Sequence, residues 1–427
     1  MEELWSSQAL FYSLSESNPL LMQVKFEFDD VLDRDCMQRA LDVAIGRYPY
    51  FRTRLVRAGE RLCLAPNDAP MLVYDDPDAP TLRASENNGY LLRVAAKDNL
   101  LSICGCHAIS DGRGLFPFFK TLLHYYWLSA TGEDPGLTGV RLAGTPVTRE
   151  ESDDPLRSFV PPGPDEAFSY SAPAVRPFVL PCEPDARSRV FTYRFSCDAE
   201  SYMSHSRAFD GSPNALTAIF ASQAIDAIHP DHPDTIVGRV TADLRPAVGV
   251  SESHHCTICL KGLPYSRKVS SMTLEERATC YRGMIILRCD PDALRGTVSE
   301  ANAAAARIQA LPTFAQKRAL GRRIVSEAYA TNTFGVSYTG RQDLGRISAH
   351  VVFGEVLTSI PGPPLCIEIL CFGPRFYFTL IQSFESEAYV RELMRQMGEA
   401  GIACDGYSRK VQPRVPFDGI EGVPVVS

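Results

Sequence analysis

A proline-rich stretch divides this chain of 427 residues into two parts. Residues 146–184 hold nine of its 31 prolines, with Gly, Asp and Ser between them. Proline fixes the backbone φ angle and lacks an amide proton, so this stretch cannot form a regular helix or sheet. We therefore predict a crossover linker between two domains, residues 1–180 and residues 181–427, with the boundary near residue 180.

Both parts combine strand and helix patterns, which predicts a mixed α/β fold. Residues 22–28 alternate strictly between apolar and polar side chains, as in a half-buried strand. The other elements predicted for the first part are a helix from Asp33 or Asp35 to Pro49, a hairpin of strands 90–96 and 100–106, and a helix over 115–128. Those predicted for the second part are strands at 189–195, 235–243, 350–355, 365–372 and 375–384, helices at 213–228, 297–330 (interrupted at Pro312) and 386–400, and a surface tail after Cys404.

Charge and cysteine content limit the class of protein. The formal net charge of −8 argues against nucleic acid or anionic lipid as the main partner. The 13 cysteines are scattered and odd in number, and the first residues are acidic where a secretory signal is basic. No uninterrupted run of about 18 apolar residues occurs. These features predict a cytoplasmic protein with reduced thiols and no membrane span.

One motif carries candidate chemistry. Cys106 to Gly112 reads Cys-His-Ala-Ile-Ser-Asp-Gly and stands between a predicted strand and a predicted helix. His107 can act as a general base because the imidazole pKa lies near neutrality. Asp111 could orient the imidazole or pair with an arginine, and Gly112 is expected where the chain turns tightly. In the simplest alternative, Ser110 or Asp111 only caps the next helix and His107 is a structural residue.

Two further landmarks give this motif a context. Arg-Tyr-Pro-Tyr-Phe-Arg-Thr-Arg at residues 47–54 precedes it, and Asp-Leu-Arg-Pro at residues 243–246 follows it. Together with His-x-x-x-Asp-Gly, this order resembles the chloramphenicol-acetyltransferase-like acyltransferases over about residues 5–400. That superfamily includes nonribosomal peptide condensation domains, alcohol acetyltransferases, polyketide-associated acyltransferases and the plant BAHD enzymes.

The resemblance implies an α/β (α+β) fold of two similar subdomains, packed as a V with a solvent channel between them. His107 would lie midway along the channel and remove a proton from the acceptor hydroxyl or amine as it attacks a thioester, without an acyl-enzyme. The donor would be acyl-CoA or an acyl carrier protein, with no other cofactor. Asp111 would be structural, held by Arg245, Arg52 or Arg54.

The resemblance also suggests substrate-binding residues. Ser337 and Thr339 fall where members of the superfamily carry a Ser- or Asn-containing turn that faces the channel, so they are candidates to bind the oxyanion or the substrate. A polar strand end before a turn explains them equally well. Cys106 replaces the first of two adjacent histidines found in the condensation branch, and we expect it to pack as an apolar residue. The Asp-Phe-Gly-Trp-Gly string of the plant branch is absent from the sequence.

Two clusters outside the motif have simpler explanations. Four potential zinc ligands lie close together: His254, His255, Cys256 and Cys259. Structural zinc sites use two spaced pairs and no second pair follows, so we predict no metal. A basic helical patch consists of Lys317, Arg318, Arg322 and Arg323. We predict a solvated face there, with docking of CoA phosphates or a carrier protein as the alternative.

The sequence therefore predicts an acyltransferase that moves an acyl group from CoA or a carrier protein to a small-molecule alcohol. A free-standing condensation enzyme that forms an amide from an amine is the second hypothesis. A non-catalytic relative that binds a thioester or a carrier protein is the third.

Overall fold

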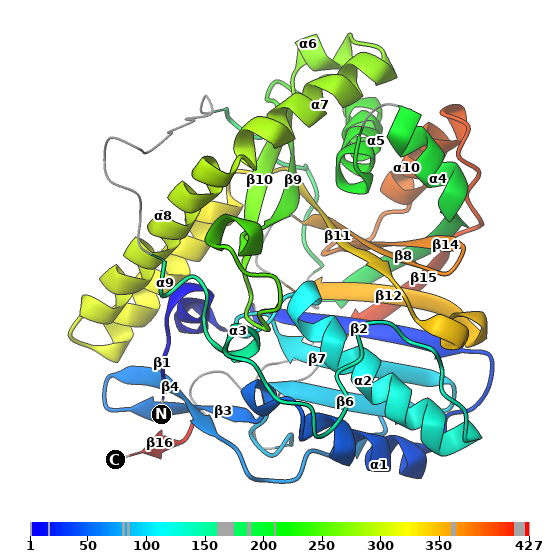
Figure 1. Cartoon of the computed structure of the whole chain (residues 1–427). Coiled ribbons are helices and arrows are strands. Elements are labelled where there is room, and N and C mark those ends of the chain that lie inside the picture. The colour runs from blue at the N-terminus through cyan, green and yellow to red at the C-terminus, as the bar shows by residue number, and fades with distance from the viewer. Residues whose placement is uncertain are drawn as a thin grey trace.

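The computed structural model describes residues 2–15, 18–78, 82, 86–159, 175–185, 189–208, 211–359, 364–413 and 423–426. These residues form a mixed α/β structure of three β-sheets with helices packed against them (Figure 1), which confirms the predicted fold class. Residues 160–174, the centre of the predicted linker, lie outside the described residues, and the boundary near residue 180 stays a prediction. Within the described ranges, no helix combines the length and apolar character needed to cross a membrane.

The first sheet has five strands in the order β12-β2-β7-β6-β5. They are β2 (Leu21–Phe28), β5 (Val73–Tyr74), β6 (Leu92–Lys97), β7 (Leu100–Cys106) and β12 (Val351–Ser359). Neighbouring strands are antiparallel except for β5 and β6. Helices α1 (Arg34–Ile45) and α2 (Gly112–Thr131) cover one face, where Phe26 of β2 stacks on Phe119 of α2.

The second sheet has seven strands in the order β10-β9-β11-β13-β14-β8-β15. They are β8 (Arg189–Asp198), β9 (Ile236–Asp243), β10 (Ile258–Tyr265), β11 (Phe334–Gln342), β13 (Leu365–Phe372), β14 (Arg375–Gln382) and β15 (Ser408–Pro413). Strand β11 runs parallel to β9 and to β13, and the other pairs are antiparallel. Helices α4 (Ala199–Ala208), α5 (Pro213–Ile228) and α10 (Ala388–Glu399) bury the apolar face of this sheet.

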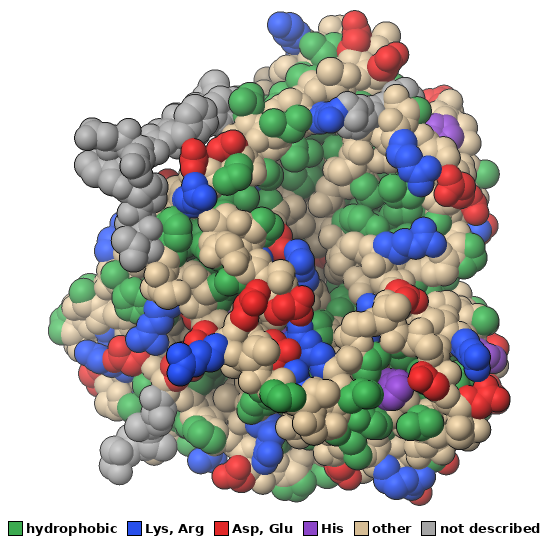
Figure 2. Space-filling model, in the orientation of Figure 1, with side chains coloured by type: hydrophobic (Ala, Val, Ile, Leu, Met, Phe, Trp, Pro, Cys, Tyr) green, Lys and Arg blue, Asp and Glu red, His purple; other side chains and the backbone are tan. Residues whose placement is uncertain are grey.

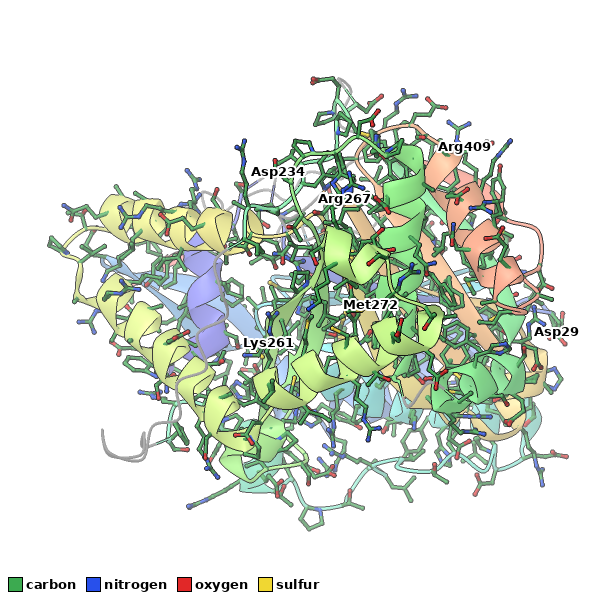
Figure 3. The ribbon with its side chains drawn as sticks, turned by 90° about the horizontal axis from the view of Figure 1, so that it is seen from above. Asp29, Asp234, Lys261, Arg267, Met272 and Arg409 are labelled. Carbon is green, nitrogen blue, oxygen red and sulfur yellow. The ribbon has the colours of Figure 1, made fainter. Side chains whose placement is uncertain are left out.

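The remaining elements lie around these two layers. A small sheet, β1-β4-β3-β16, consists of β1 (Glu2–Glu3), β3 (Thr53–Ala58), β4 (Arg61–Pro66) and β16 (Val425–Val426). Helices α8 (Pro291–Ala310) and α9 (Phe314–Tyr329) pack against the short helix η1 (Ser6–Ser13), and the view from above shows the three together at one side (Figure 3). The other helices are η2 (Pro49–Phe51), α3 (Arg149–Ser152), η3 (Arg245–Val248), α6 (Arg267–Ser270), α7 (Leu274–Arg288) and η4 (Gly345–His350).

Strand β12 connects the two parts of the chain. It follows β11 of the second sheet in sequence, yet it pairs with β2 of the first sheet along its whole length. At Gly354 the strand contacts side chains of both sheets: a Cβ there would lie 2.5 Å from Phe372 of β13 and 2.9 Å from Phe26 of β2. The lack of a side chain at Gly354 therefore permits the close crossing.

The prediction that residues 22–28 form a strand is confirmed, but the prediction that the strand is half-buried is wrong. Its polar side is buried too, with Gln23 and Lys25 only 1% and 2% exposed. Lys25 forms ion pairs with Asp78 and with Glu355 of β12, and Arg194 of β8 lies 3.6 Å from Glu355. The second sheet thus covers this side. Alternation in sequence cannot distinguish water from charged partners on the polar side of a strand.

The other predicted elements are present: β7, α5 and β13 have the predicted ends, and the rest have shifted ends. Asp33 caps α1 by accepting a hydrogen bond from the Cys36 amide (2.9 Å), and the helix ends at Ile45 rather than at Pro49. The tail after Cys404 contains a strand that the sequence analysis did not predict, because β15 adds to the edge of the second sheet. Pairing with β8 satisfies the backbone without any need for apolar periodicity in β15.

Replacing Gly354 by Ala is expected to destabilise the protein by about 1–3 kcal/mol, because the added methyl group overpacks the crossing. Gly283→Ala is the matched control, since nothing lies within 4 Å of a Cβ at Gly283 in helix α7 and alanine favours helices. Chemical denaturation measures both variants. Equal stability of Gly354→Ala and the wild type would contradict the close packing of β12.

Candidate active site

The His-x-x-x-Asp-Gly motif connects β7 to α2. Strand β7 ends at Cys106, and Asp111 is the N-cap of α2. Cys106 is buried in the core, and burial raises the pKa of its thiol to about 12, so it packs as a neutral apolar side chain, as expected. The backbone N–H of His107 donates to the Leu20 carbonyl (2.6 Å), which fixes the loop beside the start of β2.

Two cavities meet at His107, whose side chain lines both of them. The larger one, the polar cavity, has a volume of about 470 Å³ and a wall that is more polar than that of the smaller one. It lies between the motif and strands β9, β10, β11 and β13. The smaller one, about 250 Å³, is apolar and is enclosed by η1, α8, α9 and the start of β10. Its walls include Leu10, Ala301, Ala305, Ile308 and Val325. The space-filling view shows one face of the molecule deeply hollowed, with acidic and basic side chains at the lower rim (Figure 2).

The environment of His107 keeps its imidazole neutral. Burial lowers the pKa of His107 below its ordinary value, although the negative charge of Asp111 opposes the shift. Nδ1 lies 3.5 Å from the Cys256 sulfur, and burial raises the pKa of that thiol well above its ordinary value. Within the described part of the chain, Asp111 makes no hydrogen bond to His107. Asp111 therefore does not orient the imidazole directly.

Asp111 forms a buried, bidentate ion pair with Arg245. Nη1 and Nη2 of Arg245 lie 2.9 Å and 3.0 Å from the two carboxylate oxygens. The amides of Gly114 and Thr257 donate to the same carboxylate at 2.8 Å and 2.9 Å. Burial by itself raises the pKa of Asp111, but Arg245 and these amides outweigh it, so that pKa lies below its ordinary value. Nη1 of Arg245 also donates to Asp243 Oδ1 (3.1 Å), and the other guanidinium N–H groups donate to carbonyls of the loop after η3.

The arginine that pairs with Asp111 is thus Arg245, one of the three candidates that the sequence left open. Arg52 lies near the surface, 3.6 Å from Asp68, and Arg54 is exposed. Asp111 both pairs with Arg245 and caps α2, because its Oδ1 also accepts the N-cap hydrogen bond from Gly114.

Gly112 has a different role from the predicted one. It does not adopt a positive φ angle, so no tight turn requires glycine there. Instead, a Cβ at Gly112 would lie 3.0 Å from Thr339 Cγ2 of β11, and a Cβ at Gly114 would lie 2.3 Å from the His254 carbonyl oxygen. Both glycines let the second part of the chain close on the motif.

The potential zinc ligands His254 and His255 have other partners. His254 Nδ1 lies 3.0 Å from the Gly114 carbonyl and its Nε2 lies 2.9 Å from Arg141. His255 Nε2 lies 2.8 Å from the Ser152 carbonyl. Among the described residues, no group of three or more His, Cys, Asp or Glu side chains is placed to hold a metal ion. This segment packs against the motif loop.

The basic patch predicted on α9 is not one solvated face. Lys317 is buried and donates to two carbonyls at the end of α8. Arg318 is half-buried and donates to a carbonyl at the end of η1. Arg322 and Arg323 are exposed. The patch is divided because α9 packs against both α8 and η1.

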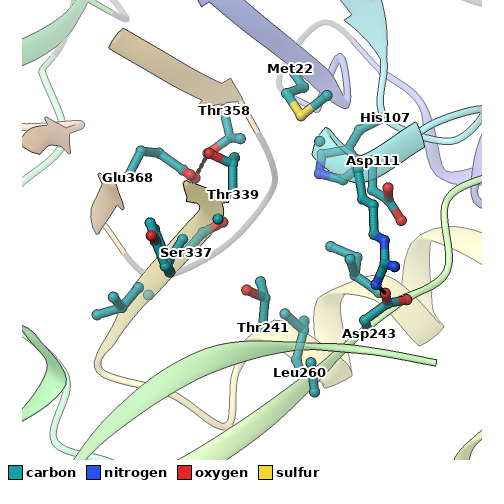
Figure 4. Close-up of a pocket in the computed structure, with 18 of the residues that line it drawn as sticks. Met22, His107, Asp111, Thr241, Asp243, Leu260, Ser337, Thr339, Thr358 and Glu368 are labelled. Carbon is teal, nitrogen blue, oxygen red and sulfur yellow. Dashed lines mark hydrogen bonds and ion pairs between the residues drawn. The ribbon is translucent and has the colours of Figure 1, made fainter. Parts of the chain in front are cut away.

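Strands β11 and β13 form the wall of the polar cavity opposite His107 (Figure 4). Ser337 and Thr339, the predicted substrate-binding residues, both lie on this wall. Thr339 Oγ1 donates to the Ile369 carbonyl (3.4 Å). The turn expected after them is an irregularity within β11, where Gly340 has a φ of 83°.

Two charged residues of this cavity were not predicted as site residues from the sequence. Arg239 of β9 and Glu368 of β13 line the same wall, and both are buried. Each interrupts an otherwise apolar stretch of a strand in the interior of the sheet. A charged residue at such a position was the available signal, because buried charges concentrate at functional sites.

Solved structures of other proteins share this fold. No protein-family model matches the sequence, and no curated protein matches it significantly. The structure is similar to TRI101 of F. graminearum, solved with coenzyme A and T-2 mycotoxin (TM-score 0.59, 12% identity, 95% of this chain and 100% of that chain). Polyketide synthase associated protein 5 from Mycobacterium tuberculosis is also similar (TM-score 0.55, 13% identity, 92% and 96%).

A third similar structure concerns condensation domain-mediated chain release from the enacyloxin polyketide synthase (TM-score 0.53, 12% identity, 94% of this chain and 81% of that chain). These similarities confirm the fold that the three sequence landmarks predicted. The arrangement of two subdomains as a V stays a prediction.

Replacing Asp111 by Ala leaves Arg245 as a buried charge without its main partner. We expect a loss of about 3–5 kcal/mol in the free energy of unfolding. Arg113→Ala is the control, because the Arg113 side chain is 56% exposed and its ion pair with Asp243 should contribute less than about 1 kcal/mol. Chemical denaturation measures the free energy of unfolding of both variants. Similar losses in the two variants would contradict a larger contribution of the buried ion pair to stability.

Proposed function

We propose that this chain, which has the fold of the chloramphenicol-acetyltransferase-like acyltransferases and condensation domains, transfers an acyl group from a thioester to an alcohol. The donor is acyl-CoA or an acyl carrier protein, and no resident cofactor takes part. His107 is the general base, and the acyl group passes directly to the acceptor oxygen. The similarity to TRI101, solved with coenzyme A, supports a thioester donor.

The observation that carries this proposal is the position of His107 at the junction of two cavities. A thioester is already activated, so the enzyme needs mainly to align two reactants and to remove one proton. Alignment can lower a barrier by about 7–11 kcal/mol, and a positioned base accelerates a reaction by about 10²–10⁴-fold. A neutral imidazole that borders both cavities can serve both needs.

The polarity of each cavity suggests what it binds. The apolar cavity, about 250 Å³ and lined by alanine and aliphatic side chains, suits the acyl group. The polar cavity suits the acceptor, whose hydroxyl must reach the imidazole. Ser337 and Thr339 stand on the wall opposite His107, where their hydroxyl groups would bind the substrate or the developing oxyanion.

Replacing His107 by Ala tests the role of the base. With acyl-CoA donors of several chain lengths and a mixed pool of alcohols and amines, we expect thiol release to fall by about 10²–10⁴-fold. His350→Ala is the control, because the His350 side chain is 46% exposed and belongs to neither cavity wall. Equal thiol release by the wild type and His107→Ala would contradict catalysis and favour a non-catalytic binding protein.

The product of the same reaction distinguishes an ester from an amide. Mass spectrometry identifies the acceptor that gains the acyl group, and mild base cleaves an ester but leaves an amide intact. We expect an ester. Acylation of amines alone would favour the free-standing condensation enzyme.

The pH dependence of the reaction should follow the protonation of His107. A base must be neutral to accept a proton, and burial lowers the pKa of His107 below its ordinary value of about 6.5. We therefore expect kcat/KM to stay constant as the pH falls from about 8 to about 6.5, and to decrease only below that range.

Glu368 lies in the same cavity, and burial raises its pKa to about 7, so Glu368→Gln provides the necessary comparison. The decrease at low pH should persist in this variant if His107 is the titrating base. A decrease centred above pH 6.5, or one that disappears in Glu368→Gln, would contradict the assignment.

A further inference from the structure

The polar cavity contains two buried charged side chains that form no ion pair with any described residue, Arg239 and Glu368. The register of the second sheet places them on one face. Gly335 of β11 pairs with Arg239 of β9 and with Cys366 of β13. Two residues further along, Ser337 pairs with Glu368. Residues two apart on a strand share a face, so both charged side chains point toward the same cavity.

Arg239 has unused capacity to bind an anion. It is only 5% exposed, and its Nη1 has no hydrogen-bond partner among the described residues. The ring of Tyr329 packs against the guanidinium at 4.1 Å, but it supplies no negative charge. Glu368 interacts electrostatically with Arg239 but makes no ion pair or hydrogen bond with it. A buried guanidinium without an anion in direct contact is costly. A ligand with an anionic group would supply the missing partner.

The guanidinium of Arg239 lies over β11 at Gly335. A Cβ at Gly335 would come 3.6 Å from Nη2 and 3.8 Å from Nε of Arg239. These distances place the guanidinium beside the strand at the cavity wall. Its planar fork of donors matches the oxygens of a carboxylate or a phosphate with two parallel hydrogen bonds.

Glu368 offers a second contact in the same cavity. It is 2% exposed, its Oε1 accepts a hydrogen bond from Thr358 Oγ1 (2.6 Å), and its Oε2 has no partner in the described chain. Figure 4 shows Glu368 and Thr358 across the cavity from His107. A buried carboxyl oxygen without a partner is unfavourable unless a bound molecule satisfies it.

We propose that the acceptor bound in the polar cavity carries a carboxylate, which Arg239 binds, and a second polar group, which Glu368 binds. The acceptor is then a hydroxy acid with a further hydroxyl or amino group. Its reacting hydroxyl faces His107 while its carboxylate faces Arg239. The identification of this ligand as the acceptor rests on the proposed acyl transfer. The anion site itself rests only on the surroundings of Arg239.

Phosphate has the same oxyanion chemistry and occurs in CoA. In acyl-CoA, however, the whole pantetheine arm separates the phosphates from the thioester, and the thioester must lie at His107. Arg239 lines the same cavity of about 470 Å³ as His107, which accommodates a small acceptor as a whole. The carboxylate of an acceptor is therefore the better match.

Calorimetric binding in the absence of a donor tests the site without turnover. The probes are small hydroxycarboxylic acids and their methyl esters, which keep the shape but lose the charge. We expect acids of the panel to bind the wild type about 10-fold or more tightly than their esters. Arg239→Met should weaken acid binding by about 10- to 100-fold and leave ester binding unchanged.

Two further variants make the comparison specific. Arg323 belongs to neither cavity wall, and its side chain is 68% exposed beside Glu327, so Arg323→Gln should change acid binding less than about threefold. Glu368→Gln should weaken the binding of acids that carry a second hydroxyl or amino group by about 10-fold, and should leave the other acids unaffected.

Stability separates a binding role from a structural one. Because no described residue forms an ion pair in direct contact with Arg239, Arg239→Met should melt at the same temperature as the wild type or higher. The proposal is overturned if acids and esters bind the wild type equally or not at all, if Arg239→Met melts clearly lower, or if this variant loses affinity for CoA instead of for the acids. Selective acid binding without thiol release would contradict the proposed acyl transfer and leave the anion site standing.

Discussion

The buried ion pair between Asp111 and Arg245 holds the two parts of the chain around one centre. Asp111 belongs to the loop between β7 and α2, and Arg245 follows β9, 134 positions later. Neither charge is accessible to water, and the pair is stable because backbone amides, backbone carbonyls and the Asp243 carboxylate satisfy the remaining donors and acceptors. All of these contacts draw the loop after η3 over the motif. His107 consequently stays at the boundary between two cavities, while Asp111 is fully engaged elsewhere.

The two faces of the second sheet have different roles, one in stability and the other in the site. One face buries apolar side chains under α4, α5 and α10. The other face carries Arg239, Ser337 and Glu368 into the polar cavity. Strand β12 follows β11 of this sheet in sequence and is an edge strand of the first sheet, so the polar cavity lies between two sheets that the chain connects at β12. Charges enclosed in this way interact more strongly than charges in water. The charge of the ligand therefore depends on the few charged side chains of the cavity and little on the net charge of −8 of the whole chain.

Much of the site was predictable from sequence because its residues stand in short, ordered strings. His107, Asp111 and Arg245 each belong to such a string, and the structure brings all three together. Arg239 and Glu368 were not predicted, because a single charged residue in an apolar strand has no spacing pattern that reveals its neighbours across the sheet. The same limit explains the buried polar side of β2, where alternation revealed a strand but not its charged partners.

By itself, the sequence determined where strands and helices form near the site, and that a histidine follows a strand and an aspartate caps a helix. These properties depend on residues within one or two turns of each other. Only the tertiary structure decided that Asp111 pairs with Arg245 rather than with Arg52 or Arg54, and that two cavities of different polarity meet at His107. Burial, ion pairing and cavity shape arise from contacts between segments far apart in the chain, and no local pattern encodes which segments will meet.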